Sequence, residues 1–385
     1  MADAVIVDAV RTPLGRRNGA LSEWHPADLA AEVLKALAER NSLDPGLVED
    51  VIMGCVSQVG EQTYNIGRNA VLGAGWPESV PGVTIDRQCG SSQQSVHFAA
   101  QGVMAGAYDV VVAAGTESMT RVPMGSSSAS GKPFGDKMRE RYHHNLIPQG
   151  LSAEMIAERW KISREEVDGY GLDSQMRALK ATEEGRFENE IVPIEVKVDG
   201  VATPFTRDEG IRPTTSAEAL ASLKPAFKED GVVTAGNSSQ ITDGSAALLI
   251  MSEDKAKELG LKPRARFTSF SVVGTDPVAM LTGPIPATEK ALAKAGLSIG
   301  DIDLFEVNEA FAAVIGAWLR ETGADWGKVN VNGGAIALGH PLGASGARLM
   351  TTLLNELERS GGRYGLQTMC EGGGLANGTI IELVA

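Results

Sequence analysis

The stretch TIDRQCGSSQQSVHFAA, residues 84–100, places one of the three cysteines of the chain between two predicted elements. An apolar strand is predicted before Cys89, and the segment after Gly90, rich in Ser, Gln and Ala, predicts a helix. A thiol at a helix N-terminus lies near the positive end of the helix dipole, which lowers its pKa and favours the thiolate. Cys89 is therefore either a nucleophile or, as is common for cysteine, a small buried residue that fills space.

Strand and helix signals alternate on both sides of this junction, which is typical of an α/β protein with a largely parallel sheet covered by helices. Residues 120–241 interrupt the alternation, because they are polar and loop-rich and carry two amphipathic helical runs but few strand signals. We expect them to form an insertion outside the sheet, between two similar αβ halves. The predicted strands lie at 4–10, 48–56, 82–87, 108–118, 244–252, 301–307, 364–370 and 379–384, and the predicted helices at 25–41, 65–75, 91–105, 152–160, 163–185, 286–296, 309–319 and 347–361.

The composition and net charge of the chain limit the kinds of molecule that it is expected to bind. The chain has 385 residues, which predicts two or three packed units, and its formal net charge is −14. Nucleic acids and anionic membranes bind proteins with an excess of Lys and Arg, so we expect neither as a partner. No apolar run approaches the about 18 residues that span a membrane. A small anionic ligand held by a few local arginines stays compatible with the charge.

The cysteine count and the start of the chain indicate a compartment. Cys55, Cys89 and Cys370 are odd in number and widely spaced, which is a poor disulfide framework and suggests a reducing environment. The first residues predict a strand rather than a secretion signal. We expect a cytoplasmic protein, with an organelle matrix left open. No zinc motif occurs, and the His143-His144 pair is interpreted as a solvated loop rather than a metal site.

Three further turns carry polar or reactive side chains next to predicted elements. Asn308 in EVNEAFAA follows a strand and is either functional or a helix N-cap. His340 in the apolar loop ALGHPLG is either functional or a turn histidine exposed to water. Cys370 precedes three glycines, residues 372–374, which let a ligand approach the backbone closely. The glycines do not match a dinucleotide or phosphate loop. Together, two thiols, an imidazole and an amide suggest nucleophilic acyl chemistry with an oxyanion hole.

The motifs NEAFA, GHPLGASG and CEGGG, together with Cys89 after IDRQ, resemble those of the thiolases. The similarity runs from DAVRTPLGR near the start to GTIIE near the end, and so covers essentially the whole chain. It implies an α/β thiolase fold in which two similar βαβαβαβ halves form a layered α/β/α/β/α core with an inserted loop domain. The implied halves are residues 1–119 with 242–264 and residues 265–385, and the implied loop domain, 120–241, binds coenzyme A and takes part in assembly.

The resemblance also implies the role of each site residue. Cys89 is the nucleophile that takes the acyl group, and His340 activates it and helps to form a first oxyanion hole. Asn308 holds a water that completes this hole. Cys370 exchanges a proton with the α-carbon of acetyl-CoA. The second oxyanion hole consists of the backbone N–H groups of Cys89 and Gly372.

Coenzyme A would be a substrate, and no metal or redox cofactor is expected. By resemblance, Arg212 lies against the adenine end of coenzyme A and Ser239 contacts the pantetheine. The other implied partners are 3-ketoacyl-CoA, acetyl-CoA and a second copy of the chain, in a homodimer or homotetramer. The segment GSSSASGKPFGDKMRER, residues 125–141, is expected to take part in assembly.

Two departures from the family pattern bear on the substrate. Ser92 replaces a common glycine and precedes the unusual Gln93-Gln94 pair, which we expect to reshape the acyl pocket. The HMG motif of short-chain enzymes is absent, with Pro148 and Gln149 in its place. We therefore expect thiolytic cleavage of medium, long or bulky 3-ketoacyl-CoA in β-oxidation.

Three alternatives remain beside this interpretation. One is a short-chain acetyl-CoA acetyltransferase that forms acetoacetyl-CoA. Another is a decarboxylating ketoacyl synthase, although such enzymes generally pair one cysteine with two histidines, whereas the second catalytic position here is Cys370. The third is a thiolase-like protein that binds acyl-CoA or lipid without catalysis, which usually lacks one of the catalytic residues.

Overall fold

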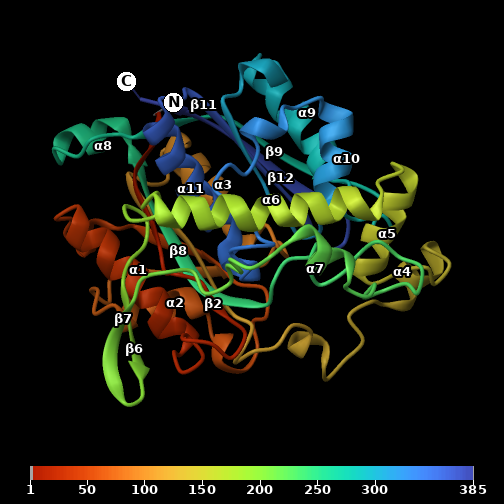
Figure 1. Ribbon diagram of the computed structural model, residues 1–385. Coiled ribbons are helices and arrows are strands. Elements are labelled where there is room, and N and C mark those ends of the chain that lie inside the picture. Colours follow the sequence, from red (N-terminus) through yellow and green to blue (C-terminus); the bar gives the residue numbers. More distant parts are fainter. Residues whose placement is uncertain (1–2, 385) are drawn as a thin grey trace.

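One mixed sheet runs through the computed structural model, which describes residues 3–384 (Figure 1). Its strand order is β10-β11-β12-β9-β1-β8-β5-β3-β4, with β2 paired to β8. The strands are β1 (Ala4–Arg11), β2 (Gly15–Arg16), β3 (Asp50–Gly54), β4 (Val83–Ile85), β5 (Val110–Ser118), β6 (Ile194–Val198), β7 (Val201–Phe205), β8 (Thr242–Ser252), β9 (Ala265–Gly274), β10 (Leu304–Val307), β11 (Tyr364–Glu371) and β12 (Leu375–Leu383). The helices are α1 (Pro26–Arg40), α2 (Ile66–Gly73), α3 (Ser91–Met104), α4 (Asp136–Arg141), α5 (Gln149–Arg159), α6 (Arg164–Glu183), α7 (Ala217–Ala221), α8 (Glu253–Glu258), α9 (Pro284–Ala295), α10 (Ala312–Thr322) and α11 (Ser345–Ser360).

The prediction of a largely parallel sheet is wrong. Among the named strands of residues 3–384, only β3 with β4, β3 with β5, and β10 with β11 pair in parallel. Strand β8 enters between β1 and β5 and is antiparallel to both. A tight turn joins β11 to β12, and a turn this short can only return the chain antiparallel. Strand β9, which the sequence did not predict, joins the two parts of the sheet through β1 and β12.

The strands of the sheet are buried on both faces, and their alternate residues belong to different cores. In β5, Val110, Val112 and Ala114 pack with α1 and α2 in one cluster. Val111 and Ala113 pack with α3 and α11 in another. This separation follows from the period of two along a strand, which sends successive side chains to opposite faces. Helices therefore cover both faces of this part of the sheet.

Helices α3 and α11 form a central layer. The same core cluster that contains residues of β5 and β8 also contains Leu304 of β10 and Ile381 of β12, so the two helices contact both parts of the sheet. On the far side, α9 and α10 pack on β10 and β11 around the fully buried Trp318. The resulting order is helices, strands, helices, strands, helices (Figure 1).

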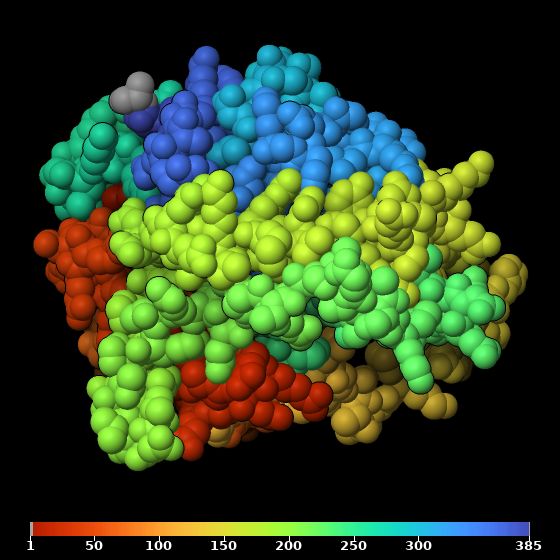
Figure 2. Space-filling model, viewed as in Figure 1, coloured from red at the N-terminus to blue at the C-terminus, as the bar shows by residue number. Residues whose placement is uncertain are grey.

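Residues 120–241 pack across the ends of these layers. Helix α6 begins with a capping box between Ser163 and Glu166, which satisfies free N–H groups at its start. Strands β6 and β7 pair with each other in a hairpin that the sequence did not predict. In Figure 2 the yellow and green atoms of this segment form a band between the red N-terminal and the blue C-terminal parts. The segment thus contacts both parts of the core.

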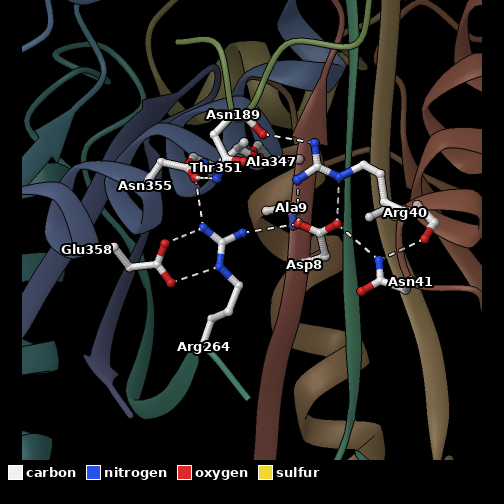
Figure 3. Close-up of polar contacts among 11 residues, drawn as sticks. Asp8, Ala9, Arg40, Asn41, Asn189, Arg264, Ala347, Thr351, Asn355 and Glu358 are labelled. Carbon is white, nitrogen blue, oxygen red and sulfur yellow. Dashed lines mark hydrogen bonds and ion pairs between the residues drawn. The ribbon is translucent and has the colours of Figure 1, made fainter. Parts of the chain in front are cut away.

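A polar cluster around Asp8 links four elements (Figure 3). The Asp8 carboxylate of β1 accepts from Arg40 Nε of α1 at 2.9 Å and from an Arg264 terminal nitrogen, just before β9, at 3.1 Å. Arg264 also binds Glu358 of α11 at 2.6 Å. Asp8 is only 5% exposed, so these cations stabilise a charge that water reaches poorly.

Candidate active site

Cys89 lies in the turn between β4 and α3, as the sequence predicted. Gln88 before it has φ 49°, in the left-handed region that L-residues rarely adopt. The turn is held by Ser91, whose hydroxyl donates to the Gln88 carbonyl at 2.6 Å. The thiol is 5% exposed. A locally strained backbone conformation thus holds a nearly buried cysteine at the start of α3.

The expected lowering of the Cys89 pKa does not occur. Burial, followed by the nearby Glu371 carboxylate, raises the pKa of the thiol to about 12. The N–H of Gly372, the N–H of Cys89 and the Gln149 side chain act in the opposite direction by stabilising the thiolate. Desolvation outweighs these dipoles because the charged form loses water on all sides. The resting residue is therefore a neutral thiol.

Cys370 comes from the carboxyl end of β11, next to the end of β10. Because β10 and β11 are parallel, Asn308 and Cys370 emerge at the same edge of the sheet, and the Asn308 N–H donates to the Thr368 carbonyl at 3.1 Å. Cys370 is fully buried, which raises its pKa, and the charge of a Cys89 thiolate raises it further. The two sulfur atoms thus lie within electrostatic reach of each other.

His340 and Asn308 form a buried pair. Asn308 Nδ2 lies 3.4 Å from His340 Nε2, and His340 Nδ1 lies 2.5 Å from the Ser345 hydroxyl. That hydroxyl donates to the Pro341 carbonyl at 2.8 Å, so it accepts from His340, which assigns the imidazole proton to Nδ1. Burial, followed by the Arg348 charge, lowers the His340 pKa to about 3. The imidazole is neutral, and its Nε2 lone pair is available.

The alternatives considered for Asn308 and His340 are excluded by their positions. The N-cap of α10 is Phe311, not Asn308. His340 is 4% exposed and so is not a solvent-facing turn residue. Among the described residues, no hydrogen bond joins Cys89 to His340. Leu342, two residues after His340, packs against the small cluster that contains Cys89.

A hollow of about 550 Å³ opens beside the nucleophile turn. Gln88 and Gln149 line it, and their side chains lie where a Cβ on Gly372 would point, at 3.1 and 3.4 Å from that position. Most of the other lining side chains are apolar, which suits an acyl group. They are Pro133, Phe134, Met138, Leu146, Ile147, Pro148, Pro277 and Met280, with Ser127, Ser128 and Gly373.

The residues that differ from the family pattern near Cys89 lie in two different places. Pro148 and Gln149 line the hollow. In contrast, the Ser92 hydroxyl accepts from the N–H of Ala347, and Gln93 Nε2 donates to the Thr379 hydroxyl at 2.8 Å. The expectation that Ser92 and the glutamine pair reshape the acyl pocket is therefore wrong, because these side chains tie α3 to α11 and to the second part of the sheet.

A second hollow of about 430 Å³ contains both residues expected to bind coenzyme A. Arg212 and Ser239 line it together with Arg16, Arg17 and Glu209. Three arginines and one carboxylate therefore face one space, and Arg16 pairs with Glu209 at 3.5 Å. The next residue, Gln240, also lines the hollow, and its carbonyl accepts from the His340 backbone N–H at 3.2 Å. A cationic recess therefore adjoins the backbone that carries His340.

Two site residues were not singled out from the sequence. Gln149 appeared only as a departure from the family pattern, yet its side chain stabilises the Cys89 thiolate. Glu371 is buried beside Cys89 and has no hydrogen-bond partner among the described residues. A signal for Glu371 was available, because an acidic residue stands inside the otherwise small and apolar turn MCEGGGLA.

Within residues 3–384, no group of three or more His, Cys, Asp or Glu side chains could hold a metal ion. His143 and His144 lie exposed in a loop. No helix in the same range combines the length and apolar character needed to cross a membrane.

Comparison with known proteins identifies a family and similar full-length chains. The family described as "Thiolase, N-terminal domain" matches residues 4–254, and "Thiolase, C-terminal domain" matches residues 261–383. A steroid 3-ketoacyl-CoA thiolase of Mycobacterium tuberculosis, FadA6, is 53% identical, covering 99% of this chain and 94% of that protein. A 3-ketoacyl-CoA thiolase of Aliivibrio fischeri is 47% identical over 99% of this chain and 100% of its own length. The crystal structure of the Bacillus anthracis acetyl-CoA acetyltransferase superposes with TM-score 0.91 at 42% identity, covering 100% and 99% of the two chains.

Proposed function

The chain belongs to the thiolase family and has its fold, and from this premise we propose that it cleaves a 3-ketoacyl-CoA with coenzyme A. The products are acetyl-CoA and an acyl-CoA shortened by two carbons, as in β-oxidation. The observation that carries the proposal is the convergence of two buried thiols, Cys89 and Cys370, with Gly372 beside them. The names of the two 3-ketoacyl-CoA thiolases support the same reaction.

The first step is attack by Cys89 on the 3-keto carbon. His340 Nε2 takes the thiol proton, because it is the unprotonated nitrogen of a neutral imidazole. The resulting imidazolium then donates from Nε2 to the oxyanion that forms. Asn308 Oδ1 is buried without a hydrogen-bond partner among the described residues, which supports a role in binding the water that completes this first hole.

The second step breaks the bond between Cα and Cβ. The electron pair stays on the departing acetyl-CoA carbon, and Cys370 gives that carbon a proton. Coenzyme A then attacks the acyl group on Cys89, and the backbone N–H groups of Cys89 and Gly372 stabilise the second oxyanion. The thiol proton of coenzyme A goes to the Cys370 thiolate. When the shortened acyl-CoA leaves, the His340 imidazolium returns its proton to the Cys89 sulfur, and the resting state is restored.

Coenzyme A binds in the cationic hollow between residues 120–241 and the arginines at the end of β2, Arg16 and Arg17. Arg212 contacts the adenine end, and Ser239 contacts the pantetheine. The three arginines of the hollow favour an anionic nucleotide despite the net charge of −14. This assignment makes residues 120–241 the loop domain, between an N-terminal half of residues 1–119 with 242–264 and a C-terminal half of residues 265–385.

The assembly and the compartment belong to the same proposal. The chain forms a homodimer or homotetramer, with residues 125–141 taking part in the contact, and works in the cytoplasm. The three cysteines are free, which suits a reducing environment. Light scattering of the purified protein measures the oligomer directly, and a monomer at working concentration contradicts this part.

The substrate is a medium, long or bulky 3-ketoacyl-CoA. The large apolar hollow at the nucleophile and the name of the steroid 3-ketoacyl-CoA thiolase favour it. The second candidate, short-chain acetoacetyl-CoA synthesis, is favoured by the name of the acetyl-CoA acetyltransferase of similar structure. Steady-state thiolysis of acetoacetyl-CoA, 3-ketododecanoyl-CoA and a ring-bearing 3-ketoacyl-CoA separates the two. We expect kcat/KM to be at least about tenfold higher for a larger substrate, since each added buried methylene contributes about 0.8 kcal/mol, whereas a preference for acetoacetyl-CoA contradicts the proposal.

A further inference from the structure

Glu371 is a buried acid that the reaction described above does not use. It follows Cys370 on β11, and its side chain is 0% exposed. Neither carboxyl oxygen has a hydrogen-bond partner of good geometry among the described residues, although the backbone N–H of Asn377 lies near enough to favour the carboxylate. Burying a carboxyl without hydrogen bonds is costly, so its position beside two reactive thiols calls for a functional reason.

The backbone directs Glu371 toward the nucleophile turn. Successive side chains of a strand point to opposite faces, so Glu371 and Cys370 leave β11 on different sides. The Glu371 carboxyl lies directly against Gly90, where a Cβ would come within 1.9 Å of Oε1. A glycine after Cys89 is therefore required for the carboxyl to reach this place.

Four charged or titratable groups face Glu371. Cys89 lies before α3, Cys370 precedes Glu371 on β11, and Asp86 and Arg87 come from the loop after β4. Arg87 favours the ionised carboxylate, but the two side chains form no ion pair within 4.0 Å among the described residues. Burial dominates and raises the Glu371 pKa to about 8, so the group changes charge close to physiological pH.

We propose that Glu371 is a positioning residue that controls thiolate formation at Cys89 through its own charge. The neutral carboxyl permits ionisation of Cys89, and the carboxylate opposes it across the Gly90 contact. The reactivity of Cys89 then stops rising with pH over the range in which Glu371 ionises, although the reactivity of a lone thiol would keep rising. The inference rests on the proposed role of Cys89 as the nucleophile, but its test does not require turnover.

The test is the rate of Cys89 alkylation by iodoacetamide against pH, read by peptide mass spectrometry in wild type and in Glu371→Gln. Glutamine keeps the shape of the neutral acid and removes the titration. We expect equal rates at about pH 6.5 and a variant-to-wild-type ratio rising to about tenfold at pH 9.5, because one pKa unit is a factor of ten in thiolate. A merely structural effect would change the rate by the same factor at every pH, and a constant ratio overturns the proposal.

A second variant keeps the carboxyl in place. Arg87→Gln removes the cation that favours the Glu371 carboxylate, so the alkaline suppression of Cys89 alkylation is expected to begin at a higher pH than in wild type. An unchanged onset contradicts the proposal even if Glu371→Gln fails to fold. Failure of Cys89 to take up an acyl group would refute the proposed function and leave these alkylation profiles interpretable.

Discussion

Asn308 and His340, which are 32 residues apart in sequence, meet through Nδ2 and Nε2 at 3.4 Å in a buried space. Asn308 follows β10, and His340 lies in the loop before α11. Ser345 fixes the other imidazole nitrogen at 2.5 Å. The imidazole is thus held from both sides, with Nε2 as the nitrogen that can take a proton.

Removing the Asn308 amide tests the first oxyanion hole. We expect Asn308→Ala to lower kcat by about 10²-fold with little change in KM, because loss of one oxyanion donor costs about 10²–10³ in rate. Steady-state thiolysis measures both constants, and Asn145→Ala, at an exposed position, is the matched control. A normal kcat in Asn308→Ala would show that the amide does not serve the reaction.

Cys370→Ala separates the two halves of the reaction. The variant is expected to lose exchange of the α-protons of acetyl-CoA with deuterium by about 10²–10⁴-fold, the range of general acid–base catalysis. Transfer of an acyl group from acyl-CoA to Cys89 should remain, because that step does not use Cys370. Deuterium exchange is followed by mass spectrometry of acetyl-CoA. Undiminished exchange would remove Cys370 from the mechanism.

The Asp8 cluster predicts that removing a buried partner lowers the free energy of unfolding more than removing an exposed one. Asp8→Asn leaves Arg40 and Arg264 without their shared carboxylate (Figure 3) and is expected to lower the free energy of unfolding by about 2–3 kcal/mol. Glu358→Gln removes a partner whose side chain is 38% exposed, and should cost about 0–1 kcal/mol. Denaturant unfolding measures both. Equal losses would mean that the cluster acts as ordinary surface charge.

The buried His97 gives a pH dependence of stability. Burial lowers its pKa to about 3, and its ring nitrogens contact Thr379 and Asn377. Below about pH 6.5 the His97 imidazole binds a proton in the unfolded state but not in the folded state. The free energy of unfolding therefore falls as the pH decreases from about 6.5 toward 3.

His97→Gln removes the contribution of this imidazole to the pH dependence of stability. Relative to the variant, wild type should lose about 1.4 kcal/mol of unfolding free energy per pH unit between about pH 6 and 4. Urea titrations at several pH values measure the difference, with His144→Gln at an exposed position as control. A difference that does not vary with pH would contradict a neutral buried His97.

The sequence predicted most of the helices and strands of the core but not the direction of the strands. Buried strands such as β5 and β8 are continuous apolar runs, and such runs have the same pattern in parallel and antiparallel sheets. Strand β9 was missed because its buried positions include Ser269 and Ser271, whose hydroxyls donate to carbonyls of α9. Periodicity based on apolar residues does not detect small polar residues that find partners only after folding.

At the site, the sequence predicted some of the side chains that come near the nucleophile turn, but it predicted the pKa of Cys89 in the wrong direction. The turn between β4 and α3 was predicted around Cys89, but the helix dipole favoured a low pKa there. Tertiary burial and Glu371, which is 282 residues away along the chain, raise this pKa instead. Distant contacts of this kind, including that of Gln149, follow from the fold and are not encoded in any local pattern.

The central claim is that the substrate acyl group becomes bound to Cys89. Intact-protein and peptide mass spectrometry after mixing the enzyme with a 3-ketoacyl-CoA, in the absence of free coenzyme A, tests it directly. The predicted result is a thioester adduct with the mass of the shortened acyl group on Cys89, which disappears when coenzyme A is added and never forms in Cys89→Ser. An adduct on another residue, or full thiolysis by a folded Cys89→Ser variant, would contradict the account.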